Sequence, residues 1–293
     1  MTGGTAPLEG AEHKEADLGE LGRLLGEGQH HGDAIAGGNT SDLSLDEILL
    51  LHSVGLEPAD VVFGIGCVSI TQGAWVWGTG EVTDARSAFH KALDDAKATM
   101  RRGCRQAKAV GVLGVEVEIE MSHHRCVIVV TGTAVRPVVD QSGSPIFKVD
   151  YHNNPFLSDL SARDFVVLST SGWYPLDLVA GVCYAHAPRR SMGTAIGQST
   201  QNVELTNFTE TLYQAREEAM EQLQSHITAA GGTGLVDAKI VDRPMHFAHH
   251  VVEFIAYGTA IKMLAKEHTH PTMSLVMPLD DVVNKFEATS LAG

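Results

Sequence analysis

The chain carries one sequence pattern twice, and this internal repeat constrains the fold more than any other feature. Ser41-Asp42-Leu43-Ser44 recurs letter for letter as Ser158-Asp159-Leu160-Ser161, 117 positions further along. At the same shift Leu51, Gly55, Pro58, Asp60, Val62 and Gly64 match Leu168, Gly172, Pro175, Asp177, Val179 and Gly181. The match predicts two fused copies of one domain, because self-similarity at a fixed spacing is the signature of a duplicated fold.

Two later blocks repeat in the same order at slightly larger shifts. Ala92–Ala96 matches Ala215–Ala219 at a shift of 123. At a shift of 126, His123-His124, Gly132-Thr133-Ala134 and Pro145 match His249-His250, Gly258-Thr259-Ala260 and Pro271. The growing shift indicates short insertions in loops, which a duplicated fold tolerates.

The repeat divides the chain into segments. Residues 1–40 are rich in Gly, Glu and His and poor in β-branched and aromatic residues. Such a segment buries too little apolar surface to order itself, so we expect a flexible arm. We expect one domain over residues 41–155, a second over 156–277, and a C-terminal tail over 278–293, with the linker between the domains within 137–155.

Each domain is expected to be a small α/β (α+β) unit of order β-β-α-β-β, with one helix packed on a mainly antiparallel sheet. The apolar runs 48–53 and 165–171 are predicted as the first strands, since Phe165-Val-Val-Leu is rich in strand formers. A hairpin then leads to the second strand. Apolar residues at helical spacing predict one helix in each copy: Phe89, Leu93, Ala96, Met100, Cys104 and Ala107, then Phe208, Leu212, Ala215, Ala219, Leu223 and Ile227.

The clearest strand follows the first helix. Val115 to Met121 alternates apolar residues with glutamates, so one face is apolar and the other acidic. Further strands are expected over 126–135 and 251–261, and a last extended piece after Pro145 and Pro271.

Three blocks of the second copy carry a family resemblance. They are Phe208-Thr-Glu-Thr-Leu-Tyr-Gln-Ala-Arg-Glu-Glu-Ala-Met-Glu-Gln-Leu, Gly234-Leu-Val-Asp-Ala and Gly258-Thr-Ala-Ile. This copy resembles the YbjQ family, a small bacterial family often labelled heavy-metal-binding, and the first copy carries a weaker version. The resemblance implies closed rings, commonly pentamers, built by edge and face packing of small sheets. The family's Arg- and Gly-rich loop has no good match in 71–83 or 189–207, and the chain lacks the Cys-x-x-Cys of soft-metal domains.

Composition excludes several function classes. A net charge of −15 repels a phosphate backbone, so we expect no nucleic-acid partner. No apolar run reaches the roughly 20 residues of a spanning helix, and the N-terminus lacks a signal-peptide pattern, so we expect a cytoplasmic protein without membrane contact. The cysteines, Cys67, Cys104, Cys126 and Cys183, are far apart and are interpreted as buried thiols.

Histidines are the candidate metal ligands. The candidates are His123, His124, His246, His249, His250, His268 and His270. Neutral imidazole binds divalent metals such as zinc, copper and nickel, and a ring can gather copies of one histidine around its axis. The alternative interpretation is that these are solvated histidines in turns, because four-ligand sites normally add Cys or carboxylate at defined spacing.

The acidic strand face has a basic counterpart in the second copy. Glu116, Glu118 and Glu120 become Lys239, Val241 and Arg243 at the local shift of 123. We therefore hypothesise that Glu116, Glu118, Glu120, Lys239 and Arg243 form register-setting contacts between unlike repeats of a ring. Unpaired surface charge is the equal alternative.

No catalytic motif appears in the sequence. A P-loop, a complete dinucleotide fingerprint and a Gly-x-Ser-x-Gly elbow are missing, so we expect no enzyme. The leading interpretation is a ring-forming homo-oligomeric binding or scaffold protein, with metal ions as one candidate ligand. A metal-dependent enzyme with a site between the repeats, and a structural or cargo component of a larger compartment, are the alternatives. The apolar tail residues can dock on the assembly itself or on a protein partner.

Overall fold

The computed structural model describes the two repeats but not the ends of the chain. Described are residues 43–71, 73–76, 78, 80–149, 151, 154–187 and 206–264, with side chains from 209 onward in the last range. The predicted arm (1–40), the predicted tail (278–293), His268 and His270 lie outside these residues, so those predictions remain predictions. The elements below all belong to one compact unit, Thr40–Gly293.

Each repeat contains the same five elements in the same order. The first has α2 (Leu45–Ser53), β1 (Leu56–Ser69), α3 (Thr83–Gln106), β3 (Gly111–Met121) and β4 (Arg125–Pro137). The second has α4 (Ala162–Thr170), β6 (Trp173–His186), α6 (Thr206–Ala229), β7 (Gly234–Pro244) and β8 (Val251–Met263). The boundaries of matched elements differ by the 117, 123 and 126 positions found in the sequence. The duplication is therefore visible in the backbone.

The first element of each repeat is a helix, and the prediction of a strand there was wrong. Ser44 caps α2 in a capping box with Glu47, and the Ser161 side chain accepts from the backbone N–H of Asp164 at the start of α4. These caps satisfy backbone donors that a strand would pair in a sheet. Phe165 lies on α4 and is fully buried, so tertiary packing overrides the local strand preference of this segment.

One long strand replaces the predicted hairpin that follows. Gly55 and Gly172 have φ of +79° and +82°, which lets the chain turn sharply from the helix into the strand. Pro58 and Pro175 then lie inside β1 and β6, each at a break in the pairing register with the neighbouring strand. The prolines therefore mark matched bulges rather than hairpin turns.

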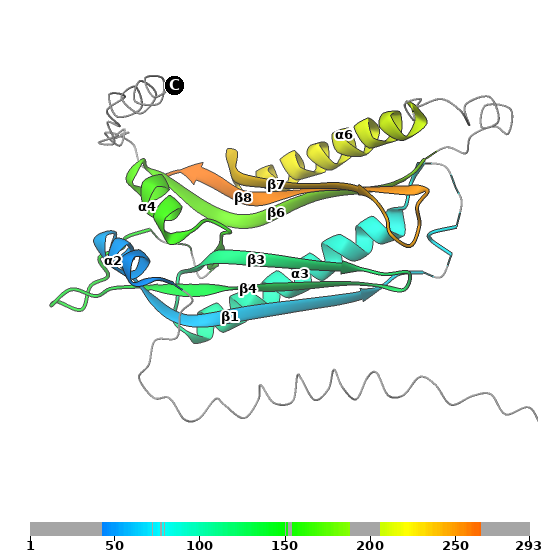
Figure 1. The fold of residues 1–293 in the computed structure, drawn as a ribbon. Helices are drawn as coiled ribbons and strands as arrows, with labels where there is room; N and C mark the ends of the chain where they lie inside the picture. The colour runs from blue at the N-terminus through cyan, green and yellow to red at the C-terminus, as the bar shows by residue number, and fades with distance from the viewer. Residues whose placement is uncertain are drawn as a thin grey trace, which may run out of the picture. The chain divides into compact units, whose positions relative to one another are not determined.

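The strands form two separate sheets (Figure 1). Each sheet has four strands and includes a short strand from the other repeat. The first sheet has the order β1-β4-β3-β5 and the second β2-β6-β8-β7. β2 (Gly80–Glu81) precedes α3 but pairs antiparallel with β6, while β5 (Phe156–Leu157) precedes α4 but pairs parallel with β3. Apart from β5, the pairings of the named strands are antiparallel, as predicted.

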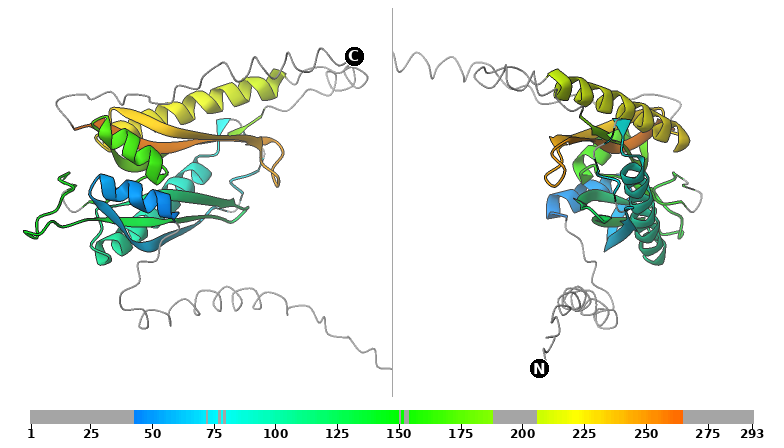
Figure 2. Two further views of the ribbon diagram at one scale, coloured as in Figure 1. Left: turned by 60° about the vertical axis from the view of Figure 1, so that its left-hand side comes forward. Right: turned by 90° about the vertical axis from the view of Figure 1, so that its right-hand side faces the viewer.

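The long helices cover their sheets at close range because glycines line the strand beneath them. A Cβ on Gly64 would lie 2.0 Å from the carbonyl oxygen of Ala96 in α3, and one on Gly181 would lie 1.9 Å from that of Ala219 in α6. α6 lies over β6 and β8, and α3 over β1 and β4 (Figures 1 and 2). The structure confirms the predicted class, a mixed α/β fold with one long helix on each mainly antiparallel sheet.

The cysteines are free thiols, but they are not all buried. Cys104, Cys126 and Cys183 are buried as predicted, whereas Cys67 is exposed on β1. Burial raises the pKa of the Cys104 and Cys126 thiols to about 12, so both are protonated at neutral pH. Among the described residues, no helix is long and apolar enough to cross a membrane.

Substituting Gly64→Ala should test the close approach of α3 to β1. The added methyl group meets backbone rather than a flexible side chain, so we expect a loss of about 3 kcal/mol in the free energy of unfolding. Gly103→Ala is the matched control, because its Cβ would lie 3.4 Å from Val62, an ordinary contact, and alanine favours the helix by up to about 1 kcal/mol. Chemical denaturation measures both, and equal stability of the two variants would contradict the packing described.

Candidate functional site

The second repeat is docked onto the first through an apolar junction. Leu178, Ala180, Val182 and Tyr184 project from β6 on the face opposite α6, and all four are buried. They belong to the same core cluster as the apolar side of α3 and residues of β3 and β4. A separate cluster packs α6 on the other face of β6 and β8. β6 and β8 are thus covered on both faces, on one by α6 and on the other by the first repeat, whereas most of β7 stays exposed.

Ion pairs from buried Lys97 and partly buried Arg101 fix the position of α3 along β6. Lys97 Nζ lies 2.8 Å from an Asp177 carboxylate oxygen and donates to the carbonyl of Leu178. Arg101 reaches the other oxygen of Asp177 at 2.6 Å. A buried cation costs several kcal/mol unless it is paired, so these contacts specify one register between the repeats.

A second zone of the junction joins the short helices. α4 lies beside α2 (Figures 1 and 2). The Phe165 and Phe156 rings stack with centroids 5.6 Å apart, in a cluster with Leu51, Leu56 and Leu113 of the first repeat. Gly111 has no room for a Cβ, which would lie 2.2 Å from the Phe156 ring. The start of the second repeat is therefore built into the first.

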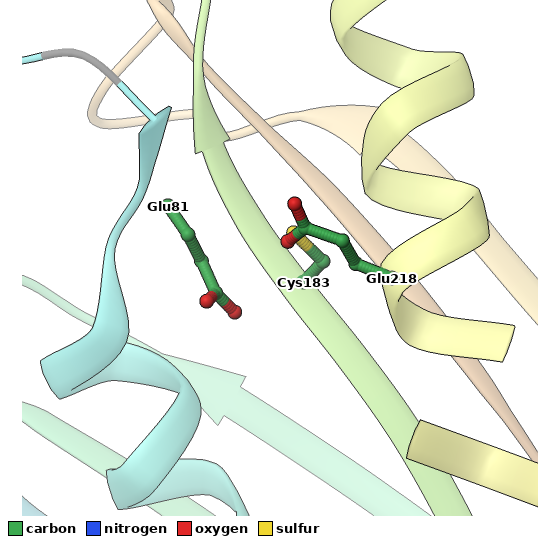
Figure 3. A group of neighbouring side chains, drawn as sticks. All are labelled: Glu81, Cys183 and Glu218. Carbon is green, nitrogen blue, oxygen red and sulfur yellow. The ribbon is translucent and has the colours of Figure 1, made fainter. Parts of the chain in front are cut away.

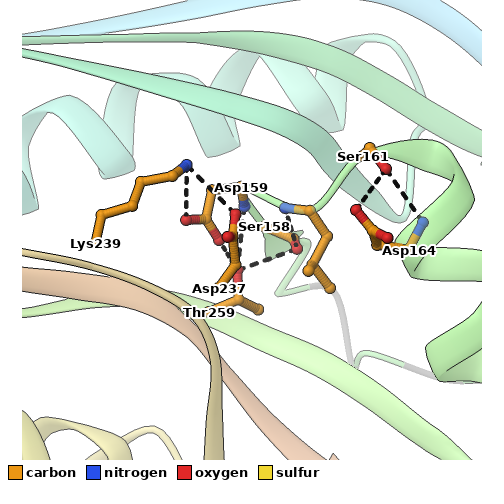
Figure 4. A network of polar contacts seen from close by, with 8 residues as sticks. Ser158, Asp159, Ser161, Asp164, Asp237, Lys239 and Thr259 are labelled. Atoms are coloured by element: carbon orange, nitrogen blue, oxygen red, sulfur yellow. Dashed lines mark hydrogen bonds and ion pairs between the residues drawn. The ribbon is translucent and has the colours of Figure 1, made fainter. Parts of the chain in front are cut away.

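A buried polar network connects this junction to the second sheet (Figure 4). Asp159, whose side chain is fully buried, accepts from the hydroxyl of Thr259 and pairs with Lys239 at 3.2 Å. Thr259 also lies 3.1 Å from the Ser158 hydroxyl, and Lys239 lies 3.4 Å from Asp237. Burial raises the pKa of Asp159, and the Thr259 hydroxyl and Lys239 oppose that rise. The repeated Ser-Asp motif and the Gly-Thr-Ala motif thus meet in one structural network.

The structure brings several candidate histidines together without placing them around a common point. The His123 and His246 rings both contact Phe247, at centroid distances of 4.3 and 4.8 Å. His124 lies 6.1 Å from His123, between ring centroids. His250 stacks on His186 at 5.5 Å, and His249 is exposed. The turns that carry them meet at one end of the two sheets, and their use as metal ligands stays a prediction.

The acidic and basic stripes approach each other inside one chain. Glu116 and Lys239 line one pocket of about 610 Å³, and Glu120 and Arg243 line another of about 290 Å³. The ion pairs of the basic residues go elsewhere: Lys239 to Asp159 and Asp237, and Arg243 to Glu253 at 2.8 Å. Glu118 is exposed. The stripes therefore belong to neighbouring edges of unlike repeats, and their role between chains stays a prediction.

A third cluster, not anticipated from the sequence, has the composition of a metal site. Ligand atoms of Glu81, Cys183 and Glu218 all lie within 4.8 Å of one another (Figure 3). The Cys183 thiol lies 3.2 Å from a Glu218 oxygen, and one Glu81 oxygen is buried without a hydrogen-bond partner. Burial raises the pKa of Cys183, and Arg86 pairs with the other Glu81 oxygen at 2.7 Å.

This donor set fits a single divalent ion of borderline softness, such as zinc. A thiolate and two carboxylates are ordinary zinc ligands, and an ion would satisfy the unpartnered Glu81 oxygen. Binding would have to displace the thiol proton, so affinity would fall at low pH. The ligands come from β2, β6 and α6, three elements far apart in the sequence, so no local spacing signalled the cluster.

Comparison with known proteins gives the chain a family. A family model described as "Putative heavy-metal-binding" (YbjQ_1) matches residues 178–264, within the second repeat. The encapsulin nanocompartment protein Rv1762c of Mycobacterium tuberculosis is 32% identical over 247 residues, which cover 82% of this chain and 92% of the relative. The chain belongs to this family. It consists of tandem YbjQ-like domains, as the sequence resemblance predicts.

Substituting Thr259→Val should test how much the polar network around Asp159 stabilises the protein. The variant keeps the side-chain volume but leaves Asp159 and Ser158 without the hydroxyl, so we expect a loss of about 1–3 kcal/mol in the free energy of unfolding. Thr228→Val is the control, because its hydroxyl bonds to a carbonyl of its own exposed helical turn, and a change below about 0.5 kcal/mol is expected. Thermal or chemical unfolding measures both variants. Equal free energies of unfolding would contradict a stabilising role of the network.

Proposed function

We propose that the protein is a homo-oligomeric scaffold, a cytoplasmic component of a protein nanocompartment. The observation that carries the proposal is that the junction between the repeats is directional. The second repeat contributes α4 and the helix-distal face of β6, whereas the first contributes α3 and the edge of β3. Unlike surfaces that meet in this way can be repeated from chain to chain.

Directional contacts generate rings or filaments, whereas a contact between like surfaces stops at a dimer. A fused pair of YbjQ-like domains then supplies two successive positions of one assembly. The relative's description as an encapsulin nanocompartment protein supports a place in such a compartment. The C-terminal tail, outside the described residues, is the segment we propose for contact with a shell or cargo protein. We assign no catalytic step to the chain, and a metal-dependent reaction between the repeats is the enzyme alternative.

The scaffold function predicts an assembled protein that associates with a shell. Mass photometry of tag-free protein should give a multiple of the 31.3 kDa chain mass, and a monomer at micromolar concentration would contradict the proposal. In the same experiment series, co-production with an encapsulin shell protein should place the chain in the shell fraction of a density gradient. Chains ending at residue 277 should be lost from that fraction while keeping their oligomeric mass. A full-length chain that never co-sediments would exclude the compartment role.

A second candidate function is binding of a divalent metal ion, and the Glu81, Cys183 and Glu218 cluster favours it. The candidate also agrees with the description of the family model. In this reading the ion would bridge β2 and β6 to α6, and so hold a strand of the first repeat to the helix of the second.

Elemental analysis of tag-free protein incubated with zinc and then dialysed tests this candidate. One zinc per chain is expected, with loss of the metal in a Cys183→Ala, Glu218→Gln variant. Cys67→Ser is the matched control, because Cys67 is exposed and outside the cluster. Metal that persists in the cluster variant but is lost on replacing His249 and His250 would assign binding to the histidines. The absence of stoichiometric metal in every protein would exclude both sites.

A further inference from the structure

The first repeat exposes apolar side chains on a sheet face that the second repeat buries. Val61, Phe63 and Ile65 project from β1 on the side opposite α3, and Phe63 is 65% exposed. We call these three residues the sheet patch. Their counterparts at the shift of 117 are Leu178, Ala180 and Val182, which are at most 2% exposed in the junction between the repeats. The same face is therefore covered in one repeat and open in the other.

The second repeat carries an apolar groove that matches the sheet patch. A groove of about 530 Å³ lies beside α6 and is lined mainly by apolar atoms. Its lining includes Leu212, Tyr213, Ile240, Val252 and Phe254. The counterparts in the first repeat are Phe89, His90, Val117, Cys126 and Ile128. All but His90 pack in the core cluster that receives the β6 face. The groove in the second repeat is therefore equivalent to the surface of the first repeat that packs against β6.

The short helices show the same relation. Leu45 and Leu49 of α2 are exposed, Leu45 to 72%, whereas their counterparts Ala162 and Val166 lie in the junction, with Ala162 fully buried. A second pocket, of about 570 Å³, is lined by Leu168, Trp173, Val236 and Ile261. The counterparts of these four are Leu51, Leu56, Leu113 and Val135, which surround Phe156 and Phe165 in the junction. The sheet patch and α2, both exposed on the first repeat, thus each have a matching unoccupied surface on the second: the groove beside α6 and the pocket beside α4.

We propose that the sheet patch of one chain docks into the groove of a second copy, while α2 enters the second copy's pocket beside α4. This contact would repeat between chains the junction that already joins the two repeats within a chain. The inference rests on the proposed function, since it names the surfaces by which the scaffold assembles. Large exposed apolar groups with matched seats mark interaction surfaces, because a soluble protein gains by covering them.

A second copy is the occupant that the geometry favours, because the docked form of this contact is present inside the chain. A chain cannot fill its own groove, because the junction holds the first repeat against the opposite face of β6. Repeating the contact therefore requires another molecule.

The charges near the two surfaces agree with this occupant. Glu116 and Glu118 lie on the same face as the sheet patch, because Phe63 pairs with Thr131 and Thr131 with Glu116, and Ile65 and Glu118 flank Val129 in the same way. The groove lining carries two arginines, Arg216 and Arg243, and one acid, Asp242, so its basic groups outnumber its acidic ones. Acidic and basic edges would then meet between unlike repeats of neighbouring chains, which sets the register and speeds association at low salt.

Paired single-face variants test the docking by mass photometry of the full chain. Phe63→Asp should disable the patch and Ile240→Asp the groove, each raising the apparent dissociation constant by about 30-fold or more, as expected for the centre of an apolar interface. Val76→Asp is the matched control, because Val76 is equally exposed and lies outside both surfaces, and it should assemble like the unmodified chain. Circular dichroism verifies that each variant is folded.

Mixing the two defective chains gives a sharper test. Phe63→Asp retains an intact groove and Ile240→Asp an intact patch, so a head-to-tail contact predicts one complex of two chains, 1:1, that grows no further. A contact between like surfaces would give no such rescue and would overturn the proposal. Unchanged assembly of both single variants would overturn it as well, while leaving the scaffold function in place. A monomeric unmodified chain would instead remove the scaffold function itself.

Discussion

The arrangement of the two repeats depends on covering the helix-distal face of β6. Four apolar side chains project from that face, while α6 packs on the opposite face of the sheet, so another part of the chain has to bury them. The first repeat supplies this cover with α3 and with residues of β3 and β4 on the α3 side of its sheet. Burial of apolar surface drives this packing, and the Lys97 and Arg101 contacts to Asp177 select one register among those that the apolar surfaces allow.

The duplicated backbone carries different side chains at equivalent positions. This difference distinguishes the junction between the repeats from the proposed contact between chains. Lys97 and Arg101 become Met220 and Gln224 in α6, and Asp177 corresponds to Asp60. The buried ion pairs thus have no charged counterpart on α6. A contact between chains would depend on apolar burial and on the acidic and basic edges, so it should respond more strongly to concentration and salt.

The polar clusters lie where the two repeats exchange chain segments. β5 leads into the Asp159 network, and β2 carries Glu81 to Cys183 and Glu218. The Glu81 cluster therefore exists only in the docked pair, whereas the residues of the Asp159 network all belong to the second repeat. A scaffold that binds an ion at the Glu81 cluster would couple binding to the packing of its repeats, because the ligands come from both.

The duplication, the long helices, the acidic strand and the family could be predicted from the amino-acid sequence, because these follow from periodicity and from matches between positions of one chain. It gave the wrong first element in each repeat, since the strand preference of Phe165-Val-Val-Leu is weaker than a Ser cap joined to burial of one helical face. The covered face of each sheet and the convergence of Glu81, Cys183 and Glu218 became visible in the folded chain alone. Both depend on contacts between segments that are distant in the sequence. A repeat pattern predicts the same contacts for both copies, although the folded chain buries a face in one copy that it leaves exposed in the other.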